Sequence, residues 1–150
     1  PHIFYKQLAA NKPASLQTAV SQGLAYQKWG TKPYPRDSYP VLEKAILIDQ
    51  ELALRSASWG LGQIMGFNFS MVGYKSAQEM VEHFKLDEEN HLVAMVKFII
   101  ASGLDDELRH HDWDGFARGY NGPGFAANKY DIKLAVAYQR WMNIKDTPLK

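Results

Sequence analysis

Apolar residues recur at helical spacing along most of the chain, and alternation of period two is almost absent. The most hydrophobic stretch follows the i, i+3, i+4, i+7, i+8 rule of a helix that buries one face. Its apolar positions are Leu92, Met95, Val96, Ile99 and Ile100. Val93, Ala94 and Phe98 leave little polar face between them, so this stretch predicts a central buried helix that ends at Gly103.

Similar spacing predicts the remaining helices. They run from Pro40 to about Leu52, from Ser76 through Phe84, over 105–110, over 113–118 and over 131–142. Ser76 and Glu79 form a capping-box pattern, in which each side chain satisfies a free backbone N–H. The segment 26–40 is too rich in Gly and Pro for a helix. The pattern predicts a mainly α fold with at most a short β-hairpin.

Size and composition narrow the class of protein. A chain of 150 residues predicts one domain over 1–150, and 46% hydrophobic with 22% charged residues is typical of a globular protein. The absence of cysteine excludes disulfides, thiol catalysis and thiolate metal sites. A net charge of +1 argues against phosphate-driven nucleic-acid binding. No apolar stretch is long enough to predict insertion into a membrane. Because the chain starts at Pro1, we expect it to lack an N-terminal segment of a longer protein.

The first motif that could carry chemistry is the segment 56–66, Ser-Ala-Ser-Trp-Gly-Leu-Gly-Gln-Ile-Met-Gly. Its three glycines permit positive φ angles and close approach of a ligand or another backbone. Gln63 offers both a donor and an acceptor to a sugar hydroxyl or acetamido group. On spacing alone, a tight connection between two helices without any ligand is an equally good interpretation.

The second motif is the segment 116–125, Phe-Ala-Arg-Gly-Tyr-Asn-Gly-Pro-Gly-Phe. A helix that breaks here presents the Tyr120 phenol and the Asn121 amide on a rigid loop, which suits carbohydrate recognition. The alternative is an ordinary Asn-Gly turn at the end of a helix.

Together, the segment 56–68, Asp112-Trp113 and the segment 116–124 resemble the N-acetylmuramidase family of the lysozyme-like superfamily. The resemblance implies a lysozyme-like helical domain that cleaves peptidoglycan between N-acetylmuramic acid and N-acetylglucosamine by general acid catalysis. The substrate-binding residues that it implies are His2, Ser58, Gln63, Tyr120, Asn121 and Gly122. It also implies a monomer without cofactor that acts on the bacterial wall, in the periplasm or outside the cell. Phage-encoded members, the endolysins, are made in the host cytoplasm.

The chain departs from this family at its catalytic glutamates. The family has a Glu-Ser segment that supplies the acid and a later Phe-Glu-x-His-x-Phe segment that supplies a second glutamate. Pro1-His2-Ile3-Phe4 matches only the tail of the latter, so we expect both glutamates upstream of residue 1. Within the chain, Glu51 is the nearest carboxylate before the first motif and a weak candidate acid. A role as a solvated helix residue is the better interpretation of Glu51.

Three alternatives to a muramidase stay open on the residues. A lytic transglycosylase would use one acid and close the sugar on itself, and a non-catalytic module would only bind the glycan. Single-strand nucleic-acid binding would use the interleaved aromatic and basic residues of 26–34, but the charge disfavours it. His110, His111, Asp112 and Asp114 suggest a metal site only superficially, because adjacent residues point in different directions. Helix capping explains the aspartates better, so no metal is expected.

Overall fold

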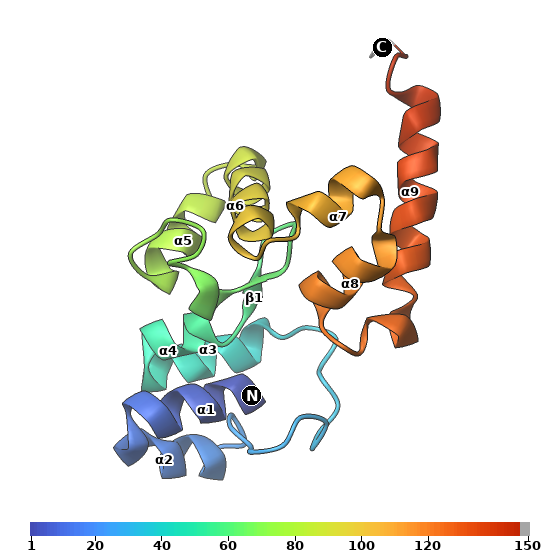
Figure 1. The fold of residues 1–150 in the computed structure, drawn as a ribbon. Coiled ribbons are helices and arrows are strands. Elements are labelled where there is room, and N and C mark those ends of the chain that lie inside the picture. Colours follow the sequence, from blue (N-terminus) through green and yellow to red (C-terminus); the bar gives the residue numbers. More distant parts are fainter. Residues whose placement is uncertain (148–150) are drawn as a thin grey trace. The chain divides into compact units, whose positions relative to one another are not determined.

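The computed structural model describes residues 1–147, and the contacts along the chain gather into two compact units, Pro1–Phe98 and Ile99–Lys150. The size of the chain predicts one domain over 1–150, which stays a prediction beside this division into two units. The fold is mainly α, with a single short hairpin among the described residues, as the sequence predicts. In Figure 1 the first unit runs from blue to yellow and the second from orange to red.

The first unit begins with two helices that the apolar spacing of the sequence does not predict. Its elements are α1 (His2–Asn11), η1 (Pro13–Ser15), α2 (Leu16–Ser21), α3 (Tyr39–Ile48), α4 (Gln50–Arg55), β1 (Ser58–Trp59), β2 (Ile64–Met65), η2 (Gly66–Asn68), α5 (Ala77–Phe84) and most of α6 (Glu88–Ala101). Residues 22–38 form neither helix nor strand, in agreement with their Gly and Pro content.

The short helix α4 is the centre of the first unit. It contacts α1, α3, α5 and η2. Its consecutive residues Leu52, Ala53 and Leu54 are all buried, although they point in different directions around the helix. Leu52 and Ala53 belong to a core with residues of α1, α2 and α3, and Leu54 belongs to a second core with α5. The buried middle of this helix therefore joins two cores.

The helix predicted from Pro40 to Leu52 is interrupted at Asp49. This residue has an extended backbone (φ −162°, ψ 111°) and caps α4, because its Oδ1 accepts a hydrogen bond of 2.9 Å from Leu52 N–H. Its Oδ2 accepts a hydrogen bond of 3.0 Å from Lys12 Nζ at the end of α1. The capping aspartate stabilises the end of one helix and the start of the next, and the spacing of apolar residues does not reveal such an interruption.

The apolar helix α6 is buried on one side only. The prediction that it is the central buried helix is therefore wrong, and α4 takes that place. Ala94 is buried, and Met95 and Phe98 pack against the core formed by Ile64, Val72, Met80 and Phe84. On the other side, Leu92, Val93 and Val96 are exposed, Val96 to 52%. An apolar stretch at helical spacing shows that a helix forms, but it does not show how many neighbours cover it. Gly103 follows at φ +64°, as expected at a helix end.

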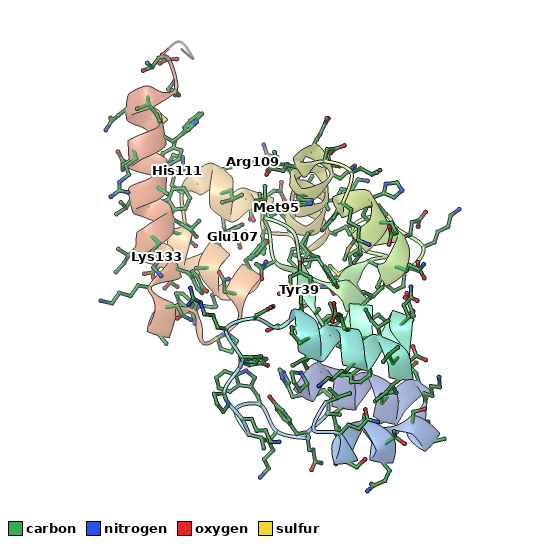
Figure 2. All side chains as sticks on the ribbon, turned by 180° about the vertical axis from the view of Figure 1, so that it is seen from behind. Tyr39, Met95, Glu107, Arg109, His111 and Lys133 are labelled. Carbon is green, nitrogen blue, oxygen red and sulfur yellow. The ribbon has the colours of Figure 1, made fainter. Side chains whose placement is uncertain are left out.

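The second unit consists of α7 (Asp105–His110), α8 (Trp113–Asn121), η3 (Phe125–Asn128) and α9 (Tyr130–Ile144). These bounds agree closely with the three helices predicted there. In Figure 2, His111 lies at the turn after α7 and beside α9. Its ring stacks on Trp113 at 5.4 Å and meets Tyr138 of α9 at 4.5 Å between ring centroids. This aromatic contact joins α9 to the start of α8.

Within residues 1–147, no helix is both long enough and apolar enough to cross a membrane.

Candidate functional site

A cavity of about 700 Å³ lies within the first unit. Its wall is built from the start of α1, the irregular segment 22–38, α3, the end of α4 and the hairpin. The polar side chains among the lining residues belong to His2, Tyr26, Lys32, Tyr34, Ser38, Ser56, Ser58 and Gln63. Concave sites of this size commonly hold small ligands or parts of polymers. The cavity therefore brings together three of the predicted substrate-binding residues, namely His2, Ser58 and Gln63.

The first motif forms the hairpin that carries Ser58 and Gln63. Strands β1 and β2 pair antiparallel, with Ser58 opposite Met65. Gly60 at φ +69° and Gln63 at φ +51° both adopt the left-handed conformation in the turn. For a residue with a side chain, that conformation costs on the order of 1 kcal/mol. The motif therefore forms a tight hairpin at the cavity rather than a simple connection between helices.

Hydrogen bonds of the side chain hold Gln63 in this strained conformation. Its Oε1 accepts a bond of 2.9 Å from Ser58 Oγ, and its Nε2 donates one of 3.0 Å to the Gly60 carbonyl. An amide has two hydrogens and two acceptor positions, so one of each is left over for a ligand after these bonds. Ser58 therefore orients the amide, and Gln63 presents it at the cavity.

His2 and Tyr34 meet on another part of the cavity wall. His2 Nδ1 lies 3.2 Å from the Tyr34 hydroxyl, within hydrogen-bond distance. Burial lowers the pKa of His2, and the charges of the amino terminus and Lys6 add to this effect. Burial also raises the pKa of the Tyr34 phenol. At neutral pH both groups are uncharged, so the pair can exchange hydrogen bonds with sugar hydroxyls.

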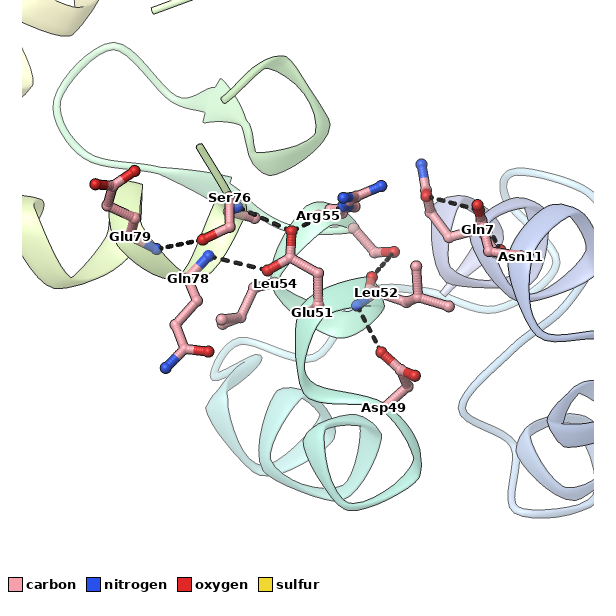
Figure 3. Close-up of polar contacts among 12 residues, drawn as sticks. Gln7, Asn11, Asp49, Glu51, Leu52, Leu54, Arg55, Ser76, Gln78 and Glu79 are labelled. Atoms are coloured by element: carbon pink, nitrogen blue, oxygen red, sulfur yellow. Dashed lines mark hydrogen bonds and ion pairs between the residues drawn. The ribbon is translucent and has the colours of Figure 1, made fainter. Parts of the chain in front are cut away.

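Glu51 contacts backbone and Arg55 rather than the cavity (Figure 3). Its carboxylate accepts hydrogen bonds from Ala77 N–H at 3.0 Å, Gln78 N–H at 3.1 Å and Arg55 Nε at 2.9 Å. Burial alone would raise the pKa of Glu51, but these three bonds outweigh it and hold the pKa below its ordinary value. A general acid needs the opposite shift. These contacts favour a structural role, in which Glu51 caps the start of α5.

Carboxyl groups are absent from the residues that line the cavity, since none of them is Asp or Glu. The second unit does contain a carboxyl group with a raised pKa, that of Glu107 on α7. A hydrogen bond shared with the neighbouring Asp106 carboxyl is the main cause, and the charges of Asp106 and Asp112 contribute. The same shared proton lowers the pKa of Asp106.

Tyr120, Asn121 and Gly122 belong to the second unit, where they form the end of α8. Tyr120 and Asn121 lie in the last helical turn rather than on a loop, and Gly122 follows at φ +80°. The Tyr120 ring stacks on Phe116 at 5.4 Å, and burial raises the pKa of its phenol. Gly122 takes a conformation available almost only to glycine, so the helix must end here.

The cavity also contains residues that the resemblance did not imply. Tyr26, Lys32 and Tyr34 line it from the irregular segment 22–38. Their interleaving of aromatic and basic side chains is visible in the sequence, where it suggests single-strand nucleic-acid binding. The placement of this segment against α1 and the hairpin is a tertiary feature, so the sequence does not connect it to the Gln63 motif.

Among residues 1–147, no group of three His, Cys, Asp or Glu side chains is arranged to hold a metal ion. Asp112 caps α8 through a hydrogen bond of 3.0 Å from Gly115 N–H. Asp114 pairs with Arg118 at 2.9 Å. The capping role predicted for Asp112 is thus confirmed.

The helical fold and its single hairpin define a domain of the lysozyme-like class. The chain belongs to the N-acetylmuramidase family, whose profile matches residues 1–142. It is similar to the crystal structure of a Burkholderia AP3 phage endolysin, with 35% sequence identity and a TM-score of 0.80. That match covers 95% of this chain and 54% of the endolysin, so the chain spans about half the length of this relative. No curated protein matches the sequence.

Proposed function

We propose that this chain is the larger part of a catalytic domain that hydrolyses the glycan strands of peptidoglycan, at the bond between N-acetylmuramic acid and N-acetylglucosamine. The observation that supports this most is the cavity of about 700 Å³ in which His2, Ser58 and Gln63 of the family motifs meet. Tyr120, Asn121 and Gly122 are proposed as further substrate contacts, presented by the end of α8. A monomer that needs no cofactor suffices for this chemistry.

We further propose that the general acid is a glutamate preceding Pro1. Glycoside hydrolysis requires a carboxylic acid beside the scissile bond, and the residues that line the cavity contain none. Pro1 and His2 themselves line the cavity. Consecutive Cα atoms are about 3.8 Å apart, so a glutamate joined directly to Pro1 would reach the cavity wall.

The test is digestion of purified peptidoglycan by the 150-residue chain and by a chain extended upstream through the two expected glutamates. Released muropeptides are identified by mass spectrometry. We expect only the extended chain to cut and to release reducing N-acetylmuramic acid ends. Replacing the upstream glutamates with glutamine should abolish this cleavage, whereas Glu51→Gln should preserve it in a protein that stays folded.

Other outcomes would identify a different activity. Anhydro ends on the products would indicate a lytic transglycosylase. Binding of the extended chain to the wall without cleavage would indicate a glycan-binding module. Cleavage by the 150 residues alone would show that an internal carboxyl acts as the acid. Glu51→Gln and Glu107→Gln would then test the two internal candidates, the first as the carboxylate before the hairpin motif and the second as a carboxyl whose pKa is raised by its hydrogen bond with Asp106.

A further inference from the structure

The cavity of the first unit is lined by positive but not by negative side chains. Lys32 is the single Lys or Arg among its lining residues, and Asp and Glu are absent from them. His2, the other titratable base of the wall, is neutral at pH 7 because burial lowers its pKa. Pro1 also lines the cavity, and burial lowers the pKa of its amino group. Among residues 1–147, the ammonium of Lys32 is therefore the one side-chain charge at this wall.

Within residues 1–147, no carboxylate forms an ion pair with the Lys32 ammonium. Lys12 and Lys85 form ion pairs with Asp49 and Glu82, at 3.0 and 2.8 Å. In the described part of the chain, no carboxylate lies within the 4.0 Å ion-pair distance of Lys32 Nζ. Lys32 is exposed, so its ammonium is open to a ligand that enters the cavity, and a positive charge beside apolar and neutral groups attracts an anion.

The backbone at Gly23 leaves room for this ammonium. Gly23 lines the cavity at φ +71°, and Lys32 Nζ lies 3.5 Å from the position that a Cβ of Gly23 would occupy. Lys32 follows a turn that is closed by a side-chain hydrogen bond, in which Thr31 Oγ1 donates to the Lys28 carbonyl at 2.7 Å. The side chain therefore follows the cavity wall at Gly23.

We propose that Lys32 is a specificity-determining residue that binds a carboxylate of the substrate in this cavity. The inference rests on the proposed function, and it adds that the cavity distinguishes an anionic glycan from a neutral one. A lysine suits this role because its three donors can follow a carboxylate on a flexible strand.

Peptidoglycan offers such a carboxylate from two sources. The lactyl group of N-acetylmuramic acid carries a free carboxylate where the strand has no peptide. Where a peptide stem is attached, that lactyl group is in an amide bond, and the remaining carboxylates belong to the stem. Both present the same chemistry to Lys32, and a set of glycans with defined carboxylates separates them.

The experiment measures dissociation constants of the 150-residue chain and its variants by isothermal titration calorimetry. Four tetrasaccharides serve as probes: an N-acetylglucosamine tetramer, a peptide-free strand with free lactyl carboxylates, the same strand with its lactyl groups as methyl amides, and a strand with peptide stems. The variants are Lys32→Met, Lys32→Arg and Lys28→Met. Lys28 lies on the same segment, is exposed and does not line the cavity, so it is the matched control. The Pro1 amino group is common to all variants and cancels in the comparison.

We expect Lys32→Met to weaken binding of at least one carboxylate-bearing strand by about tenfold and of the two neutral probes by less than about twofold, since a charge-assisted contact is lost only with the anion. Lys32→Arg and Lys28→Met should bind like the original chain.

The pattern of weakened binding identifies the carboxylate. Weaker binding of the peptide-free strand alone identifies the lactyl carboxylate, and weaker binding of the peptide-bearing strand identifies a carboxylate of the peptide stem. Equal weakening for charged and neutral probes, or none for either, overturns the role of Lys32 while leaving the glycan site intact. Failure to bind any of the four probes, both by the original chain and by the chain extended upstream through the expected glutamates, overturns the proposed function as well.

Discussion

At the scale of single residues, Gln63 stands out because its backbone conformation is strained. It adopts a left-handed backbone conformation, and it bonds through its side chain to Ser58 and to the Gly60 carbonyl. The strain is stored in a tight turn beside the cavity and is offset by bonds that exist only when the hairpin is closed. Backbone strain held in this way is common at binding sites.

Replacing Gln63 with alanine removes both side-chain bonds and keeps the strained φ. We expect the variant to remain folded, with a loss of about 1 kcal/mol of unfolding free energy, and to bind peptidoglycan about fivefold to tenfold more weakly. Urea denaturation and a wall sedimentation assay measure the two effects. Gln78→Ala, at an exposed position of α5, is the control and should change neither. Unchanged wall binding by the Gln63 variant would contradict its role as a substrate contact.

Gly66 is confined by backbone rather than by its own φ. A Cβ at this position would clash with the Leu54 carbonyl oxygen and would lie 2.8 Å from the Arg55 Cα. Neither backbone atom can move without displacing α4. We therefore expect Gly66→Ala to lower the unfolding free energy by about 1–3 kcal/mol, which thermal and urea denaturation would show. Gly124→Ala, where a Cβ meets nothing within 4 Å, should be nearly neutral, and equal effects of the two would exclude this explanation.

At the scale of helices and strands, the connections depend on carboxylates used as caps. Asp49 separates α3 from α4, Glu51 accepts from the first backbone N–H groups of α5, and Asp112 starts α8. Glu51 adds a tertiary bond, since it lies on α4 and caps another helix 26 residues away in sequence. Removing this carboxylate should loosen α5 from α4.

The contribution of Glu51 to stability should depend on pH in a defined direction. Its folded pKa lies below the ordinary value of 4.5, so its stabilisation is complete above that value and is lost as the pH falls through the folded pKa. We expect Glu51→Gln to cost about 1 kcal/mol at pH 7, and the difference from the original chain to become smaller at a second pH well below 4.5, where the carboxylate takes up its proton.

Urea denaturation at the two pH values would measure this effect. Glu43→Gln removes an exposed glutamate of α3 and should have little effect at either pH. A loss for Glu51→Gln that is the same at both pH values would show that Glu51 acts through packing rather than through its charge.

At the scale of the whole molecule, the division into two compact units implies that a substitution that destabilises one unit has little effect on the stability of the other. Gly119 on α8 packs so closely on Leu104 that a Cβ would clash with the leucine side chain. In hydrogen exchange read by mass spectrometry, Gly119→Ala should speed exchange in α7 and α8 about tenfold and leave α4 unchanged. Gly124→Ala in the same unit should leave both regions unchanged. Faster exchange of α4 in the Gly119 variant would show that the two units open together.

The sequence predicts the class of fold and several helices well, because local signals determine them. The capping pattern at Ser76 places the start of α5, and Gly103 ends α6. The sequence does not predict the central place of α4, which is only six residues long, because the burial of Leu52, Ala53 and Leu54 depends on neighbours from distant segments. The site divides in the same way, since the motif shows Gln63 but not Lys32 or Tyr34. Those two reach the cavity only through the path of an irregular segment.

That irregular segment, residues 22–38, has a consequence for how such a domain can diverge. It forms one wall of the cavity, yet it contributes no helix or strand to the scaffold and is fastened at its two ends by α2 and α3. Leu24 and Ala25 at its start are buried in the core with Leu52 and Ala53, but residues 27–38 are exposed, so insertions, deletions and side-chain changes there alter the mouth of the cavity without disturbing the packing around α4. Cell walls vary between bacterial lineages in their cross-links and substituents. Under the proposed function, a domain of this architecture can follow that variation through one loop, and a library of variants at residues 27–38 is the place to seek a different substrate range.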